Sequence, residues 1–227
     1  MRKEYRKLIM NTGLLAIGSF ASSLLGMLLT PFYTMVLSTQ DYGVSDLITT
    51  TTSLLYPFMT VAISEAIMRF ALDKGTDKKS VYTIGISIVV LGFCLILCGS
   101  PFIRSTAIGE YFGFFLLYYL SYAMHTITSY FVKGLEKVKI YSVAGLINSG
   151  IVICANLLFL LVFEWGIVGY LLASILGHSF TTLFLFFGAK AYQHIIAPWK
   201  IDREEVKGIN QIPDENRIYA GQELYLP

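Results

Sequence analysis

Charged side chains are scarce in this sequence of 227 residues. Asp, Glu, Lys and Arg together make up 14% of the chain, whereas an ordinary soluble domain carries about 25%. Hydrophobic residues make up 55%, and the mean hydropathy is +0.64. A soluble protein of this size could not remove so much apolar surface from water. The composition therefore excludes an ordinary soluble domain and favours a chain whose solvent is lipid.

Motifs of the common enzyme classes are also missing. The sequence contains no G-x-x-x-x-G-K-[ST], no H-E-x-x-H, no G-x-S-x-G and no G-x-G-x-x-G. Cys94, Cys98 and Cys154 lie inside apolar runs without a neighbouring His or carboxylate. We interpret them as small apolar packing residues and not as a disulfide framework or a metal site. The sequence thus predicts no catalytic residue, no enzyme activity, no cofactor, no metal and no nucleic-acid partner.

Long runs without a single charge dominate the rest of the chain. The five longest span 8–40, 80–103, 111–132, 140–163 and 165–189. Each exceeds the roughly 20 residues that a helix needs to cross about 30 Å of hydrocarbon. A sixth run, 47–64, reaches that length only by extending past Glu65. We therefore predict an all-α membrane protein with six transmembrane helices in one antiparallel bundle, at about 9–38, 43–73, 79–102, 109–135, 138–163 and 166–190.

Basic residues indicate how these helices are oriented. Lys and Arg at 2–7, 74–79, 133–139 and 190–217 fall on one side, whereas the loops of the other side contain only Arg104. The positive-inside rule then places both termini in the cytoplasm. An even number of helices independently requires both ends on one side. Pro31 and Pro57 are expected kink points in two helices that look longer than the bilayer is thick.

Two charges interrupt the apolar character of the second helix. In "SEAIMRFALD", residues 64–73, Glu65 and Arg69 are four residues apart and would share one helix face. In one interpretation they pair with each other, and Arg69 reaches the inner head groups. In the other they line a water-filled cavity and bind a charged substrate. The residues alone leave both interpretations open.

Uncharged polar residues in the expected helices add further candidates. Thr51 falls near the Glu65 face of its helix, where its hydroxyl could face a cavity or bond its own backbone. His125, His178 and Asn148 lie within apolar helices, where such residues form helix–helix hydrogen bonds or contribute to a transport pathway. Tyrosines of the fourth helix could stack on sugar rings or mark the membrane interfaces: Tyr111, Tyr118, Tyr119, Tyr122 and Tyr130. The candidate substrate-binding residues are Arg69, Glu65, Thr51, His125 and Asn148.

The first seventy residues resemble the start of a known membrane family. The marks are an Asn-Thr pair at Asn11, a proline at Pro31, the "DYG" turn at 41–43 and the "EAIMRFALD" ending at 65–73. These features resemble the polysaccharide flippases, which are the O-antigen or oligosaccharide-unit translocases of the MOP exporter superfamily. The resemblance covers about residues 5–205.

This resemblance implies a function in surface polysaccharide and lipopolysaccharide biosynthesis. Such proteins move an undecaprenyl-pyrophosphate-linked oligosaccharide from the inner to the outer leaflet of the bacterial cytoplasmic membrane. It also implies that Arg69 contacts an anion, since its planar fork suits phosphate oxygens, and that Glu65 fixes Arg69 or titrates. The expected partners are the lipid-linked oligosaccharide and membrane lipids.

The expected helix number departs from the family pattern. Members have twelve or more helices, so a chain with six is expected to be an N-terminal lobe. It would be a truncated half-transporter that works as a homodimer or with a second six-helix lobe, because alternating access moves one repeat against another. The alternative is a non-transporting membrane remnant or an interaction partner of the polysaccharide assembly machinery.

The end of the chain suggests two further segments after the lobe at 1–190. Residues 191–207, which include "APWKIDREEVK", look like the amphipathic cytoplasmic linker that follows the sixth helix in that family. Residues 208–227, "GINQIPDENRIYAGQELYLP", resemble the last part of a LysM repeat. The first strand and first helix of such a module are missing. We therefore expect a splice of two genes and a poorly ordered tail that is not a working glycan-binding module.

Overall fold

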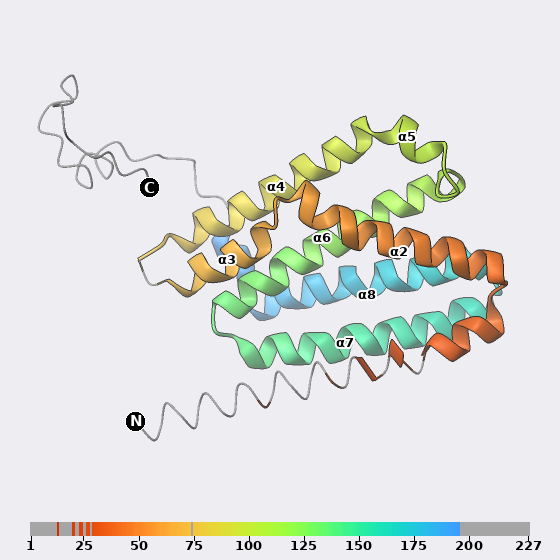
Figure 1. The fold of residues 1–227 in the computed structure, drawn as a ribbon. Coiled ribbons are helices and arrows are strands. Elements are labelled where there is room, and N and C mark those ends of the chain that lie inside the picture. Colours follow the sequence, from red (N-terminus) through yellow and green to blue (C-terminus); the bar gives the residue numbers. More distant parts are fainter. Residues whose placement is uncertain are drawn as a thin grey trace, which may run out of the picture. The chain divides into compact units, whose positions relative to one another are not determined.

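The computed structural model describes residues 29–73 and 75–195, with residues 13, 20, 23, 24, 26 and 27 of the preceding stretch. All regular secondary structure in this described part is helical (Figure 1), which confirms the all-α class. The chain divides into two units, Met1–Ile195 and Ile196–Pro227. The second unit, with most of the expected linker and the whole LysM-like tail, lies outside the described residues, so those expectations stay predictions.

The first unit consists of long helices joined by short turns. Residues 29–36 are helical. The elements that follow are α2 (Thr39–Met59), α3 (Ile63–Leu72), α4 (Lys78–Cys98), α5 (Ser100–Arg104), the 3-10 turn η1 (Gly109–Tyr111), α6 (Phe112–Gly134), α7 (Val138–Asn156), the π-helical turn η2 (Leu157–Val162), α8 (Gly166–Gly188) and the 3-10 turn η3 (Ala191–His194). The predicted range 79–102 is wrong at its end, because α4 stops at Cys98 and the separate short helix α5 starts at Ser100.

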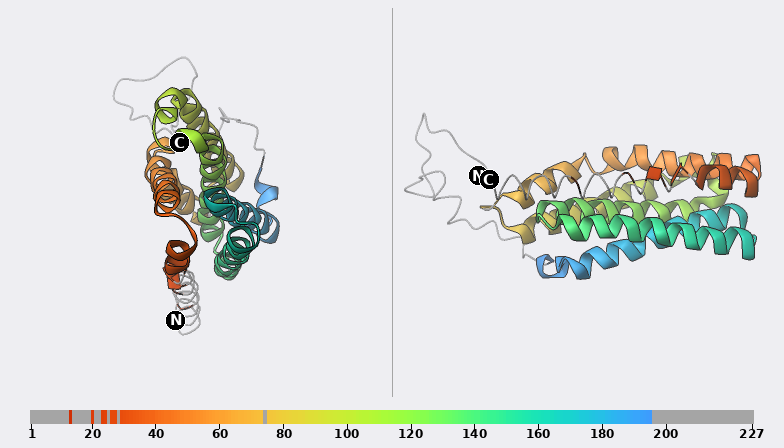
Figure 2. Two further views of the ribbon diagram at one scale, coloured as in Figure 1. Left: turned by 90° about the vertical axis from the view of Figure 1, so that its right-hand side faces the viewer. Right: turned by 90° about the horizontal axis from the view of Figure 1, so that it is seen from below.

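Helix α6 forms the centre of this bundle. It packs against α2, α3, α4, α7 and α8, and Figures 1 and 2 show these helices side by side. Phe115, Tyr119, Ala123, Ile127 and Phe131 are all fully buried. They recur every four residues and therefore form one continuous stripe along the helix. The core of the lobe is built around that stripe.

Three helical stretches of the described part are long and apolar enough to cross a membrane: α4, α7 continued by η2, and α8. The bent pair α2–α3 makes a fourth if it is counted as one span. The spans support a membrane protein. Helix α6 is not among them, although it is 23 residues long. Of the 30 residues of the first expected helix, 14 lie outside the described residues. The count of six and the cytoplasmic position of both termini therefore stay predictions.

The second expected helix is broken into two. Its predicted range, 43–73, is wrong as a single helix, because α2 and α3 meet at an angle of 60°. Thr60 ends α2: both its backbone N–H and its hydroxyl donate to the carbonyl of Tyr56, at 3.0 and 2.7 Å. Val61 and Ala62 then adopt left-handed φ values of 50° and 49°. The bend expected near Pro57 is therefore present, but the two residues with left-handed φ, Val61 and Ala62, come after the proline.

Candidate functional site

Aromatic and imidazole rings from three helices meet near the middle of the bundle. We call Tyr56 of α2, Tyr118, Tyr122 and His125 of α6, and His178 of α8 the aromatic–histidine cluster. The ring centroids of His125 and His178 are 5.1 Å apart. Tyr118 and Tyr122 lie edge-on to His178, at 5.8 and 5.7 Å. Tyr56 meets Tyr122 at 5.5 Å, so the cluster reaches from α8 to α2.

Helix geometry explains why these rings meet. Tyr118, Tyr122 and His125 follow the i, i+4, i+7 spacing that places side chains on one face of α6. Helices α6 and α8 run in the same direction, and His125 and His178 each lie near the midpoint of their own helix. The two imidazoles are therefore at the same level of the bundle.

Hydrogen bonds connect the cluster to the broken helix. The hydroxyl of Tyr56 lies 2.5 Å from that of Ser64, so the bond spans the break between α2 and α3. Nε2 of His125 lies 3.4 Å from the hydroxyl of Ser129. Nδ1 of His178 is buried and has no partner among the described residues. An unpaired buried polar atom costs about 1–3 kcal/mol, so the cluster retains the capacity to bind a polar group.

Two sequence candidates lie on neighbouring helices. Asn148 of α7 accepts a hydrogen bond from Thr181 of α8 at 3.5 Å. It therefore contributes to the contact between these two helices. Thr51 is half-buried on α2, whereas the next residue, Thr52, is fully buried. Within the described residues, no hydrogen bond joins Thr51 or Asn148 to the aromatic–histidine cluster.

Glu65 and Arg69 are both exposed on α3. The structure shows no ion pair between them in its described part, and both the pairing and the cavity interpretations stay predictions. Among the described residues, the two side chains lie on the exposed face of α3. The reason is the way α3 packs: its buried residues are Ser64, Ile67 and Ala71, which face α4 and α6. Glu65 lies close to the hydroxyl of Tyr130 on α6.

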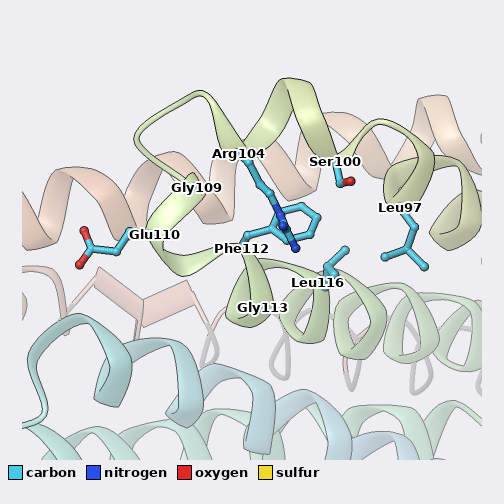
Figure 3. Close-up of a pocket in the computed structure, with 8 residues that line it drawn as sticks. All are labelled: Leu97, Ser100, Arg104, Gly109, Glu110, Phe112, Gly113 and Leu116. Atoms are coloured by element: carbon cyan, nitrogen blue, oxygen red, sulfur yellow. The ribbon is translucent and has the colours of Figure 1, made fainter.

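A pocket of about 620 Å³ lies where α4 ends and α6 begins, at the end of the bundle away from Arg69 (Figure 3). It lies between α4, α5, η1 and α6. The guanidinium of Arg104 lies over the ring of Phe112, with its Cζ 4.9 Å from the ring centroid. Glu110 points away from Arg104 in Figure 3. In the sequence, Arg104 is the basic residue of the loops predicted to lie on the side opposite the lysines. The pocket offers one cation against an aromatic wall, which is too little to define a ligand.

The meeting of His125 and His178 was not predicted from the sequence, although both residues were noted. The available signal was their position near the midpoints of two helices that run in the same direction. Tyr56 was also missed, because its place in the cluster depends on the packing of α2 against α6.

Comparison with known proteins gives one match. The model of a family described as "Polysaccharide biosynthesis protein" matches residues 8–202, a range that includes all the helices of the described part. No curated protein and no solved structure is significantly similar to the chain.

Proposed function

The chain belongs to the polysaccharide biosynthesis protein family, the polysaccharide flippases of the MOP superfamily, and from this membership we propose that it translocates a lipid-linked oligosaccharide. The proposed substrate is an undecaprenyl-pyrophosphate-linked oligosaccharide for surface polysaccharide such as O-antigen. It moves from the inner to the outer leaflet of the bacterial cytoplasmic membrane. The family match over residues 8–202 is the observation that carries this proposal.

The broken helix α2–α3 supports a transport function. Transporters of several folds form substrate sites where interrupted helices meet polar groups in the bundle interior. Here the break adjoins Tyr56 and Ser64, and Tyr56 leads to the two histidines. No side chain caps the start of α3, and the helix dipole at that end favours an anion. The rings of the cluster offer broad apolar faces with polar tips, which suit a sugar.

Arg69 and Glu65 have a different role in this proposal. Both are exposed on α3, at the end of the bundle that carries most of the lysines. We propose that Arg69 contacts the diphosphate of the incoming substrate, because guanidinium binds phosphate oxygens in a bidentate way. Glu65, next to Tyr130, would orient that face of α3. His125, Asn148 and Thr51 would act later, along the path through the bundle.

The lobe also presents surface that another lobe could cover. In the apolar span formed by α7 and η2, only 11% of the most apolar stretch of residues is buried within the chain. We therefore propose that transport needs two lobes, either as a homodimer or with a different six-helix lobe. The same exposed surface also favours the alternative function, in which the chain is a non-transporting partner of polysaccharide assembly enzymes.

Complementation tests these two functions. The chain is expressed alone in a flippase-deficient strain, and surface polysaccharide is measured by immunoblot of whole cells. Restored polysaccharide supports transport by this chain. Its absence, with the protein present in the membrane fraction at normal amounts, leads to co-expression with a second family lobe. If neither condition restores polysaccharide, the chain does not transport and the alternative stands. Arg69→Ala serves as the matched variant, expected to insert normally and to lose complementation.

A further inference from the structure

Basic residues from three segments meet at the end of the bundle where α4 begins and α6 and α8 end. Lys78 and Lys79 open α4, Lys137 lies in the turn between α6 and α7, and His194 ends η3. We call these four residues the basic cluster. The turn η3 packs against both α4 and α8. The ring of His194 lies edge-on to Phe131 of α6, with centroids 5.5 Å apart.

Packing and hydrogen bonds hold part of this cluster in place. The ammonium of Lys137 donates to the carbonyl of Ala189, just past the end of α8. A cation at a helix C-terminus is also favoured by the helix dipole. One turn earlier, Lys133 lies over the rings of Tyr130 and Tyr141, at 4.7 and 4.3 Å from their centroids. Lys133 and Lys137 therefore differ from the flexible lysines of an ordinary protein surface, because these contacts hold their ammonium groups in place.

The carboxylate of Asp77, next to Lys78, has little hydrogen-bonding capacity left for the cluster. Asp77 caps α4: its oxygens accept from the backbone N–H groups of Lys79 and Ser80, both at 3.1 Å, and from the Ser80 hydroxyl at 2.8 Å. Lys78 and Lys79 form no ion pair with a carboxylate of the described residues. Within the described residues, the cluster is therefore a concentration of positive charge in which neither Lys78 nor Lys79 has a carboxylate ion-pair partner.

The pKa of His194 reflects its burial and the positive charges of the basic cluster. Its pKa is lowered, first by burial and then by the positive charges of Lys137, Lys78 and Lys79, with Asp77 acting in the opposite direction. Nδ1 of His194 is buried and has no partner among the described residues. The imidazole is therefore held neutral beside three ammonium groups, and an anion bound there would favour its charged form.

We propose that the basic cluster binds a phosphate group carried by a lipid head group. The cluster lies at the end of the apolar helices α4 and α8, which is the level where head groups meet a membrane protein. Two adjacent lysines, a fixed ammonium and an imidazole supply several donors to one phosphate. The site is separate from the aromatic–histidine cluster, and it does not depend on the proposed transport function.

Native mass spectrometry measures this binding on the full chain purified in detergent with phosphatidylglycerol and phosphatidylcholine. We expect one phosphatidylglycerol to be retained in preference to phosphatidylcholine. The double variant Lys78→Gln/Lys79→Gln should weaken that retention on the order of tenfold, since each lysine near a head group contributes about 1 kcal/mol. Lys139→Gln/Lys190→Gln is the matched control. It removes the same charge at the same end but leaves the cluster intact, so retention should be unchanged. Equal losses in both double variants would overturn the site.

A titration of His194 followed by NMR separates binding from general membrane charge. In nanodiscs that contain phosphatidylglycerol, the pKa of His194 should rise relative to phosphatidylcholine nanodiscs. That rise should be much smaller in the Lys78→Gln/Lys79→Gln variant and should persist in the control variant. The same pKa with and without phosphatidylglycerol, or an equal rise in both variants, would contradict the proposal. A full rise produced by inorganic phosphate alone in detergent would show that the site takes free phosphate and not a lipid.

Discussion

Asn156 joins the helical stretch 29–36 to the end of α7. The side chain is fully buried, and its amide donates to the hydroxyl of Tyr33 at 3.0 Å and to the carbonyl of Val152 at 2.8 Å. Tyr33 in turn meets Tyr170 of α8 edge-on at 4.9 Å. This polar contact and the packing of Tyr33 and Leu37 against Leu160 together position the helical stretch 29–36.

Tyr33→Phe should therefore lower the free energy of unfolding by about 0.5–1 kcal/mol, which is typical of an interhelical hydrogen bond in a membrane protein. The loss is modest because the Asn156 amide keeps its bond to Val152. Thermal unfolding in detergent measures it. In the background of Asn156→Leu, the same Tyr33→Phe change should have almost no effect. Additive effects of the two substitutions would show that the bond does not stabilise the lobe.

His178 allows a test that separates function from stability. Replacing it with Phe keeps a ring of similar size and removes two nitrogens, of which Nδ1 is buried without a partner in the described part of the chain. Because an unpaired buried polar atom is costly, His178→Phe should leave the melting temperature unchanged or raise it. If the cluster contacts the sugar, surface polysaccharide in the complementation assay should fall at least about tenfold, as expected when one hydrogen bond to a polar substrate is lost.

Tyr119→Phe is the matched control for that experiment. The Tyr119 hydroxyl is also buried without a partner among the described residues, but its ring lies outside the aromatic–histidine cluster. We expect neither stability nor complementation to fall in this variant. Equal loss of polysaccharide in both variants would indicate a general effect on packing. Normal polysaccharide with His178→Phe would show that the imidazole does not contact the substrate.

Individual candidate residues were predictable from the sequence to different degrees. Charges and imidazoles inside apolar runs identify Glu65, Arg69 and His125 as unusual without a structure. Their surroundings were not predictable, because helical spacing says which residues share a face but not what that face packs against. Ser64, Ile67 and Ala71 turn toward α4 and α6 and leave Glu65 and Arg69 exposed.

At the scale of elements, α3 and α6 approach closely at Gly134. A Cβ on this glycine would lie 2.5 Å from Cβ of Ala71 and 2.8 Å from the carbonyl oxygen of Met68. Gly134→Ala should therefore push the two helices apart and lower the free energy of unfolding by about 1–3 kcal/mol. Thermal unfolding of the purified variant measures this change.

Gly150, inside α7, provides the contrasting case. A Cβ there would meet nothing within 4 Å. Gly150→Ala should raise the free energy of unfolding by about 0.5–1 kcal/mol, because alanine is the better residue in a helix interior. If both alanine variants changed stability in the same direction, close packing at Gly134 would not be what distinguishes the two sites.

The start of α4 depends on Asp77, whose side chain accepts from the N–H groups of Lys79 and Ser80. Asp77→Ala should cost about 0.5–2 kcal/mol, as for other N-caps. The hydrogen bond from Ser80 is the main reason that the pKa of Asp77 lies below its unfolded value of 3.8. A lowered pKa stabilises the fold above that value and loses the contribution as pH falls through the folded pKa.

Asp77→Asn separates the cap from the charge. Asparagine is an equally good N-cap, so stability at neutral pH should be close to that of the parent. Below about pH 4 the parent should lose stability relative to the variant, because only the parent has a carboxylate to protonate at this position. Unfolding midpoints compared at pH 7 and pH 3 test this. Parallel pH dependence in the two proteins would exclude Asp77 as its source.

Element boundaries were predicted well where charge-free runs end at basic or turn residues. The expected ranges 109–135, 138–163 and 166–190 agree within two residues with η1–α6, α7–η2 and α8. The break after α2 was not predictable to the same degree. Pro57 signals a disturbance, but the left-handed residues Val61 and Ala62 depend on the Thr60 cap and on the bond of Tyr56 to Ser64.

At the scale of the whole molecule, the least buried span is the one formed by α7 and η2. Val143, Leu146, Leu158 and Leu161 are all exposed there, and such residues are stable only against lipid or another apolar surface. Helix α6 shows the opposite arrangement. Its polar side chains lower its mean hydropathy, so it is not among the helices apolar enough to cross a membrane. It is nevertheless the centre of the core, because it packs against its neighbours. Burial within the lobe, and not hydropathy alone, therefore decides which helices need lipid.

The orientation of the bundle is open to a direct test by cysteine labelling. Cys94, Cys98 and Cys154 are exposed and must first be replaced by serine or alanine. Single cysteines are then placed at Thr106, between α5 and η1, and at Gly75, before α4; both positions are exposed and lie at opposite ends of α4. The excess of lysine at the Gly75 end places that end in the cytoplasm. A membrane-impermeant maleimide should therefore label Thr106→Cys in intact cells and label Gly75→Cys only after permeabilisation.

The reverse labelling pattern would invert the orientation. It would also place Arg69 at the outer leaflet, where a substrate made in the cytoplasm would not first meet it. Labelling of both positions in intact cells would show that α4 does not span the membrane.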